Sequence, residues 1–191
     1  QRPRLTYLSN CRNVTIQDVR LINSPFWTNH IYKSDHVRYL DCYIYAPTSG
    51  IYPPDPKRGA PSSDAIDIDA CTDILVSGCY MNVCDDAVVL KGGKGTWADR
   101  DSTNGPCERI LIEDCHYGTV HGCLTLGSES LHDRNIILRG CLSSKIIKIS
   151  IVRIQRFVKD SGAARLPVDL PIFFFYTGGK ERSVVPCPPC C

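Results

Sequence analysis

A short segment recurs five times along the chain, and this repeat restricts the folds that the sequence can adopt. Each copy has a polar residue, about three β-prone residues, two polar or small residues and a final small apolar residue. The last positions of successive copies are 23, 37, 36 and 26 residues apart, so the bare repeat has a period in the low twenties and two copies carry insertions. The five copies are residues 13–19, 36–42, 73–79, 109–115 and 135–141. Short strands at such a period are typical of a solenoid.

Composition identifies the insertions and a second set of strands. Pro, Gly and Ser are frequent in residues 47–63 and 92–106, which predicts two long loops. Further β-prone runs occur at 26–32, 65–69, 87–91 and 123–127. We therefore predict an all-β chain that folds as a parallel β-helix, in which each coil stacks on the one before it. An antiparallel β-sandwich is the alternative, but it does not require its strands to resemble one another.

Small apolar residues end the five copies of the repeat, and we expect them to form a column inside the β-helix. They are Val19, Cys42, Cys79, Cys115 and Cys141. Solenoids need a cap at each end, and residues 1–10 are too few to form one, so we expect the fold to lack its N-terminal cap.

Twelve cysteines in 191 residues are a high count, and their spacing does not match a zinc site. We expect a secreted protein with some disulfides, with a reduced intracellular protein as the alternative. No apolar run has the form of a signal peptide or the length of a membrane span. The net charge of +2 requires neither nucleic acid nor membrane as a partner, and we predict a monomer without a cofactor.

Three polar clusters in the middle of the chain predict an acid/base site. Asp64 precedes Asp85 and Asp86 by 21 and 22 residues, about one coil, which places Asp64 beside Asp86 on the next rung, about 4.8 Å away. His121 should occupy the following rung, because residues 92–106 loop out. Carboxylates this close raise the pKa of at least one of them, as cleavage of a glycosidic bond requires. A calcium site is the alternative.

Aspartates also follow the first of these clusters. Surface turns of β-solenoids are often rich in Asp, whose side chains cap backbone donors. We therefore expect Asp67, Asp69 and Asp73 to be structural turn residues.

The same clusters resemble the motifs of a known family. Residues 62–67, 85–92 and 121–129 are similar, in this order, to the Asn-Thr-Asp-Gly-Ile-Asp, Gly-Asp-Asp-Cys-Ile-Ala and Gly-His-Gly motifs of the polygalacturonases of glycoside hydrolase family 28. The residues after the second and third motifs are closer to exo-acting, plant and bacterial members. The resemblance covers about residues 10–141. It implies a right-handed, single-stranded parallel β-helix of the pectin lyase type and inverting hydrolysis of α-1,4-linked galacturonic acid in pectin.

The resemblance also implies roles for individual residues. Asp85 matches the general acid, and Asp64 and Asp86 match the pair that orients and deprotonates water. His121 matches the histidine that supports protonation of the acid. Lys91 is our candidate partner for a substrate carboxylate, because an acidic polysaccharide needs cations near the cleft. No metal is implied, and the family's location is extracellular, in or near the cell wall.

The C-terminal part of the chain departs from the family. The Arg-Ile-Lys motif expected on the coil after the histidine is absent, and residues 153–155 read Arg-Ile-Gln instead. Residues 1–141 carry 14 Lys+Arg against 17 Asp+Glu, whereas residues 142–191 carry 8 against 3. We predict a partial catalytic β-helix over 1–141 and a divergent tail over 142–191. The alternatives for function are an inactive, truncated β-helix that binds cell-wall polysaccharide, a hydrolase of rhamnogalacturonan and a purely structural solenoid.

Overall fold

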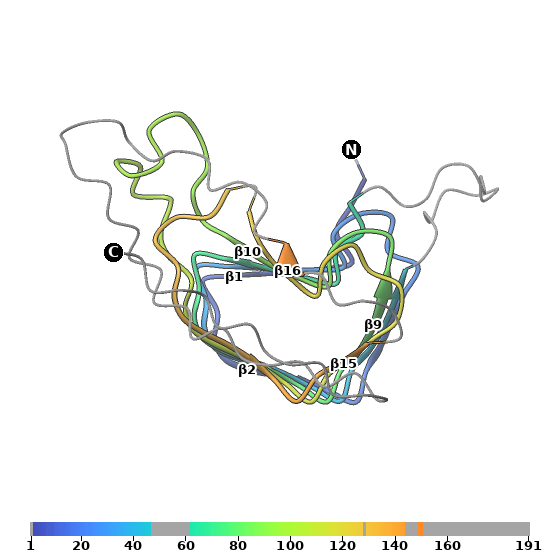
Figure 1. Ribbon diagram of the computed structural model, residues 1–191. Coiled ribbons are helices and arrows are strands. Elements are labelled where there is room, and N and C mark those ends of the chain that lie inside the picture. Colours follow the sequence, from blue (N-terminus) through green and yellow to red (C-terminus); the bar gives the residue numbers. More distant parts are fainter. Residues whose placement is uncertain (1, 47–61, 128, 144–148, 151–191) are drawn as a thin grey trace, which may run out of the picture.

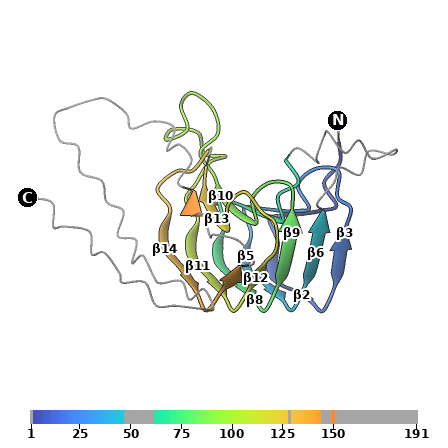
Figure 2. The same ribbon diagram turned by 45° about the vertical axis from the view of Figure 1, so that its right-hand side comes forward.

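The computed structural model describes residues 2–46, 62–127, 129–143 and 149–150, which form strands and turns. The strands lie in three sheets (Figures 1 and 2). The first sheet contains, in spatial order, β1 (Thr6–Ser9), β4 (Asn29–Tyr32), β7 (Ile66–Asp69), β10 (Val88–Lys91), β13 (Leu124–Leu126) and β16 (Ile149–Ser150). The second contains β14 (Arg134–Arg139), β11 (Glu108–Glu113), β8 (Thr72–Ser77), β5 (Asp35–Leu40) and β2 (Arg12–Gln17). The third contains β15 (Leu142–Ser143), β12 (His116–Tyr117), β9 (Tyr80–Val83), β6 (Tyr43–Ala46) and β3 (Arg20–Ile22).

The chain visits the three sheets in turn, and every neighbouring pair of strands is parallel. This arrangement confirms the predicted parallel β-helix and excludes the antiparallel sandwich. The repeated segments form the second sheet, and the second set of β-prone runs forms β4, β7, β10 and β13 of the first sheet, whereas β1 and β16 were not predicted. The sequence did not predict the third sheet, whose strands have only two to four residues. No described residue belongs to a helix, so none forms a helix that could cross a membrane.

Small residues form the predicted column inside the coils. Cys42, Cys79, Cys115 and Cys141 are buried, each with at most 4% of its surface exposed. Val19 has the same register, since the Tyr43 N–H donates to Val19 O as the Tyr80 N–H donates to Cys42 O, but it is 39% exposed because it follows the edge strand β2. None of the nine cysteines within the described ranges forms a disulfide, so the expectation of disulfides is wrong for them. Cysteines 187, 190 and 191 lie outside the described residues.

The bend between the second and third sheets requires an unusual backbone conformation. Asp41, Gly78, Asp114 and Gly140 occupy this bend in successive coils, and all have positive φ angles between 52° and 66°. Asp and Gly tolerate the left-handed region better than most residues. The Asp41 side chain lies against Gly78, where an added Cβ atom would be 2.2 Å from Asp41 Oδ1.

The loops and the C-terminal region agree only in part with the described structure. Residues 92–106 contain no strand, as predicted, whereas residues 47–61 of the other predicted loop lie outside the described residues. The strands β15 and β16 continue the third and first sheets beyond Cys141, where the recognisable sequence repeat stops. The rest of the predicted tail, including residues 153–155, lies outside the described residues.

Candidate active site

The predicted acidic residues lie where the chain enters the first sheet. Asp64 comes just before β7, and Asp85 and Asp86 form a bend between β9 and β10. A bend is necessary because consecutive residues of a regular strand point to opposite faces. The Ala65 N–H donates to Asp86 O at 3.0 Å, which places Asp64 beside Asp86 on the next rung, and the His121 N–H donates to Asp85 O at 2.9 Å. The structure therefore brings together the three aspartates and the histidine that the sequence predicted.

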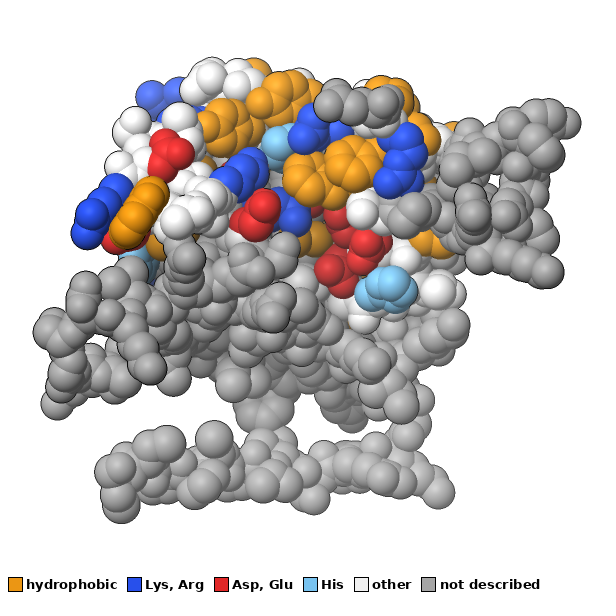
Figure 3. All heavy atoms as spheres, turned by 90° about the horizontal axis from the view of Figure 1, so that it is seen from above, with side chains coloured by type: hydrophobic (Ala, Val, Ile, Leu, Met, Phe, Trp, Pro, Cys, Tyr) orange, Lys and Arg blue, Asp and Glu red, His pale blue; other side chains and the backbone are white. Residues whose placement is uncertain are grey.

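The carboxylates of Asp64, Asp85 and Asp86 each offer an oxygen within 4.8 Å of the others. Asp64 is 5% exposed, and its Oδ1 accepts the Asp86 backbone N–H at 3.0 Å. The Asp85 side chain is 30% exposed and lies 3.2 Å from Nδ1 of His121, whose side chain is 74% exposed. Asp64 therefore forms the floor of the cluster, and Asp85 and His121 form its open side. Figure 3 shows acidic side chains beside a histidine on this face.

Burial and mutual repulsion keep protons in this cluster. Burial, reinforced by the neighbouring charge of Asp85, raises the pKa of Asp64 to about 7, although Lys91 opposes the shift. Burial also raises the pKa of Asp86 above its usual value. At mildly acidic pH Asp64 therefore keeps a proton next to two further carboxyl groups. Neighbouring carboxyl groups whose environments separate their pKa values can divide the roles of acid and base between them.

Ser63 fixes the backbone beneath the acids. Its hydroxyl donates to Ala46 O at 3.0 Å and accepts the Cys84 N–H at 3.0 Å. One buried side chain thus ties the end of β6 to the residues that precede Asp64 and Asp85. This role of Ser63 was not predictable from the sequence, because it depends on which three segments meet in space.

Lys91, the predicted substrate-binding residue, lies beneath the acids rather than on the surface. It is 7% exposed, and its Nζ lies 3.6 Å from Asp67 Oδ1 and 4.7 Å from the ring centroid of Trp27. Asp67 is fully buried and faces the charge of Asp64, and burial raises its pKa well above the usual value. Lys91 also lowers the pKa of Asp64, so its charge acts on both carboxyl groups.

The expectation that the following aspartates cap surface turns is wrong. Asp67 and Asp69 lie within β7 and are at most 1% exposed. Asp73 lies in β8 and binds Arg109 through two hydrogen bonds of 2.7 and 2.8 Å.

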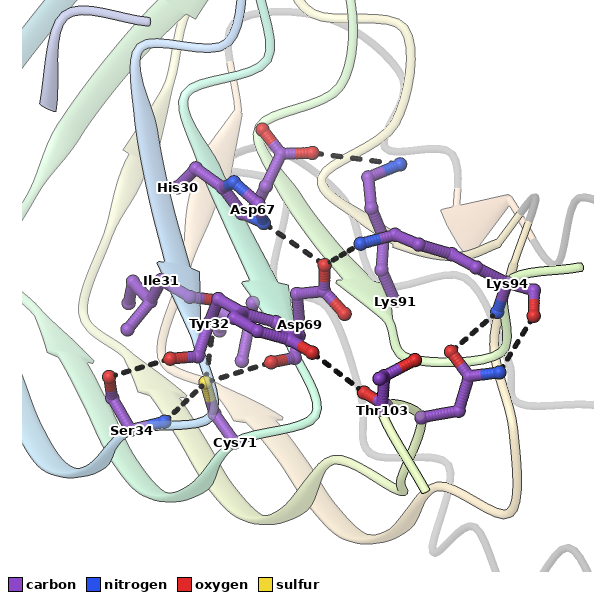
Figure 4. A network of polar contacts seen from close by, with 12 residues as sticks. His30, Ile31, Tyr32, Ser34, Asp67, Asp69, Cys71, Lys91, Lys94 and Thr103 are labelled. Atoms are coloured by element: carbon purple, nitrogen blue, oxygen red, sulfur yellow. Dashed lines mark hydrogen bonds and ion pairs between the residues drawn. The ribbon is translucent and has the colours of Figure 1, made fainter. Parts of the chain in front are cut away.

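Asp69 connects the first sheet to the loop 92–106 (Figure 4). Its carboxylate lies 3.0 Å from His30 Nε2 and forms an ion pair with Lys94 of the loop. Burial alone raises the pKa of Asp69, but the hydrogen bonds from His30 and Lys94 outweigh burial and lower it. The Tyr32 hydroxyl of the neighbouring strand β4 donates to Thr103 O at 2.8 Å and ties that strand to the other end of the loop. The loop is therefore anchored at two points, at the C-terminal ends of β7 and β4.

Comparison with known proteins identifies the family of this fold and site. Residues 1–150 match glycosyl hydrolases family 28. The chain belongs to this family. A probable polygalacturonase of Vitis vinifera is 30% identical over 130 residues, which are 67% of this chain and 24% of that protein. A probable polygalacturonase of Arabidopsis thaliana is 23% identical over 193 residues, 95% of this chain and 38% of that protein. This family 28 chain thus spans between a quarter and two fifths of the length of these relatives.

Solved structures of family 28 enzymes resemble this chain. An exopolygalacturonase from Thermotoga maritima has a TM-score of 0.60 and 31% identity, over 74% of this chain and 29% of that one. A polygalacturonase from Erwinia carotovora has a TM-score of 0.61 and 25% identity, over 74% of this chain and 32% of that one. The fold is thus the right-handed parallel β-helix that the sequence motifs implied.

Proposed function

We propose that this protein hydrolyses α-1,4-galacturonosidic bonds of polygalacturonate by acid/base catalysis. The observation that carries the proposal is the cluster of Asp64, Asp85 and Asp86 on adjacent rungs, with His121 beside Asp85. The names of the relatives, which are polygalacturonases, support the choice of substrate.

In the proposed reaction Asp85 donates a proton to the glycosidic oxygen, because it lies on the open side of the cluster where a polymer can reach it. Asp64 and Asp86 orient and deprotonate the attacking water. His121 keeps the Asp85 carboxyl oriented through their contact. Before substrate binds, burial raises the pKa of Asp64 to about 7, so its proton must leave before Asp64 can act as a base. Lys91, which lowers that pKa, favours the ionised form.

The stereochemical outcome needs its own measurement. The oxygens of the three carboxylates lie within 4.8 Å, whereas two carboxyl groups about 6.5–9.5 Å apart are usual for inverting glycosidases. The inverting mechanism therefore rests on the family resemblance and not on this spacing. Proton NMR of the first product tests it: the β-anomer indicates inversion, and the α-anomer contradicts it.

The proposed substrate is the acidic polysaccharide pectin, and the proposed location is the extracellular space or cell wall. We further propose that the protein acts as a monomer without nucleic acid or membrane as a partner. Asp67 Oδ1 lies 3.6 Å from Lys91 Nζ and holds this ammonium group beneath the acids. We therefore propose that Lys91 attracts the substrate carboxylate by long-range electrostatic attraction and not by direct contact.

A reducing-sugar assay on polygalacturonate tests the activity. Asp85→Asn should reduce the rate about 10²–10⁴-fold, the usual contribution of a general acid. Asp73→Asn is the matched control and should leave the rate unchanged, because Asp73 binds Arg109 on the second sheet. Equal background rates of the parent chain and Asp85→Asn would instead indicate a binding protein without activity. Hydrolysis of rhamnogalacturonan but not of polygalacturonate would show that the enzyme acts on a different pectic substrate from the one proposed.

EDTA separates acid/base catalysis from the calcium alternative. The three carboxylates have the spacing of a metal site, so this alternative has a structural basis. We expect the rate of hydrolysis to be the same with and without EDTA. A loss of activity that Ca²⁺ restores would contradict the proposed mechanism.

A further inference from the structure

The column of stacked residues that contains Asp64 and Asp86 continues into the N-terminal coils. The Thr28 N–H donates to Asp64 O at 2.8 Å, and the Leu5 N–H donates to Trp27 O at 3.4 Å. These bonds place Trp27 one rung below Asp64 and Arg4 one rung below Trp27. At about 4.8 Å per rung, Arg4 lies roughly 10 Å along the β-helix from Asp64. A polymer lying along the axis over the acids would therefore pass over these two residues.

Aromatic side chains hold the Arg4 guanidinium in place. Its Cζ lies 4.9 Å from the ring centroid of Trp27, 5.4 Å from that of Tyr7 and 5.8 Å from that of Phe26. Lys91 contacts the same indole, with Nζ 4.7 Å from the centroid. Cation–π contacts of this kind orient a guanidinium without neutralising its charge.

Arg4 has no ion pair with any carboxylate of the described residues. The nearby Lys91 and Lys94 differ, because they contact the buried carboxylates of Asp67 and Asp69. Arg4 is also exposed. It is thus an oriented cation that remains available to a ligand. Figure 3 shows basic and hydrophobic side chains close to acidic ones on one face of the molecule.

We propose that Arg4, held by Trp27 and Tyr7, is a binding site for the carboxylate of a uronic acid unit on the N-terminal side of the catalytic cluster. This inference rests on the proposed function and names a subsite for its substrate. A guanidinium can bind a carboxylate through two parallel hydrogen bonds, and its fixed position reduces the entropy lost on binding. The subsite gives the acidic cluster an exposed cationic contact in addition to the buried Lys91.

Tryptophan fluorescence can measure binding at this subsite directly. The chain has two tryptophans, and Trp97 lies 64% exposed in the loop 92–106. In an Asp85→Asn, Trp97→Phe background, Trp27 is the only indole, and turnover is suppressed. Titration with trigalacturonate should then change the fluorescence of Trp27 in a saturable manner. The fully methyl-esterified trisaccharide, which lacks the charge, should bind more weakly.

Adding Arg4→Gln to this background should weaken trigalacturonate binding about tenfold, which corresponds to about 1.4 kcal/mol. Arg20→Gln is the matched control, because Arg20 lies 4.4 Å over the Tyr43 ring on the third sheet and should not affect binding. Arg4→Lys keeps the charge without the planar fork, so it should bind with intermediate affinity even if Arg4→Gln folds poorly. Unchanged affinity in both Arg4 variants, or an equal loss in Arg20→Gln, would overturn the subsite.

The outcomes of this experiment are distinct from those of the hydrolysis assay. Arg4-dependent binding without release of reducing sugar supports the subsite and contradicts hydrolysis by this chain. Hydrolysis by the parent chain with no effect of Arg4 on affinity contradicts the subsite and leaves the proposed function intact.

Discussion

Replacing the buried Asp64 by Asn should stabilise the fold at neutral pH. The pKa of Asp64 is about 7 in the folded chain, against 3.8 for an ordinary aspartate, because the side chain is buried and faces Asp85. Between these values the folded state binds a proton that the unfolded chain has released, so stability falls as the pH rises through this window. A difference of about three pKa units corresponds to about 4 kcal/mol above pH 7. Asn has no proton to lose and avoids this cost.

The substitution retains the main contact of the side chain, because the Asn oxygen can still accept the Asp86 N–H that Asp64 accepts at 3.0 Å. Urea unfolding from pH 4 to pH 8, followed by circular dichroism, gives the free energy of unfolding of both chains. The variant should match the parent near pH 4, and its advantage should grow to as much as about 4 kcal/mol by pH 8. Other groups that titrate in both chains largely cancel in the difference.

A difference that stays constant from pH 4 to pH 8, or that decreases, would refute this account of the buried carboxyl. Asp73→Asn is a control with the opposite sign. The hydrogen bonds from Arg109 lower the pKa of Asp73, so its contribution is present above the unfolded pKa and is lost as the pH falls. Asp73→Asn should therefore lower stability at neutral pH and lose this effect in acid.

Three further predictions concern the scaffold. Gly78→Ala should lower the free energy of unfolding by about 1–2 kcal/mol, because φ is +66° and the new Cβ would meet Asp41. Gly95→Ala places its Cβ where no atom lies within 4 Å, so it should lower the free energy of unfolding by less in the same urea titration. Lys94→Met should lower the free energy of unfolding by about 1–2 kcal/mol and speed proteolysis of the loop 92–106, because it removes a partner of the buried Asp69. An unchanged rate of cleavage in the loop would contradict the anchoring role of Lys94. Alkylation of the unfolded chain without reductant should label all nine described cysteines, as mass spectrometry can verify, whereas protected pairs would indicate disulfides.

The sequence repeat was sufficient to predict two of the three sheets. Its period brought equivalent residues onto neighbouring rungs, so the 22-residue interval from Asp64 to Asp86 correctly predicted their contact. The third sheet was missed although its strands are about as long as those of the first sheet, because each begins only three residues after a strand of the second sheet ends and was not recognised as a separate element. The same period could have predicted the contact between Arg4 and Trp27, because these residues are 23 positions apart, which is the length of the bare repeat.

Burial of the aspartates in β7 was not predictable from their local sequence. Asp67 and Asp69 look like turn residues, yet they face Lys91 and Lys94 on the outer side of the first sheet. Their cationic partners come from β10 and from the loop that follows it, more than 20 residues away. Only the folded chain shows that these cations cover the carboxylates and compensate for their burial.

The repeat length by itself determined which residues lie next to each other, because hydrogen bonding between parallel strands aligns equivalent positions of successive coils. It therefore determined the β-helix and the grouping of Asp64, Asp85 and Asp86, the proposed catalytic residues, with His121. The tertiary structure decided how deeply each group lies and what covers it. Burial sets the free-energy cost of ionising a carboxyl group, which is why Asp64 retains a proton up to a pH of about 7. Packing between coils also decided that the described cysteines form no disulfides. It also left Arg4 oriented by three rings and free of an acidic partner among the described residues.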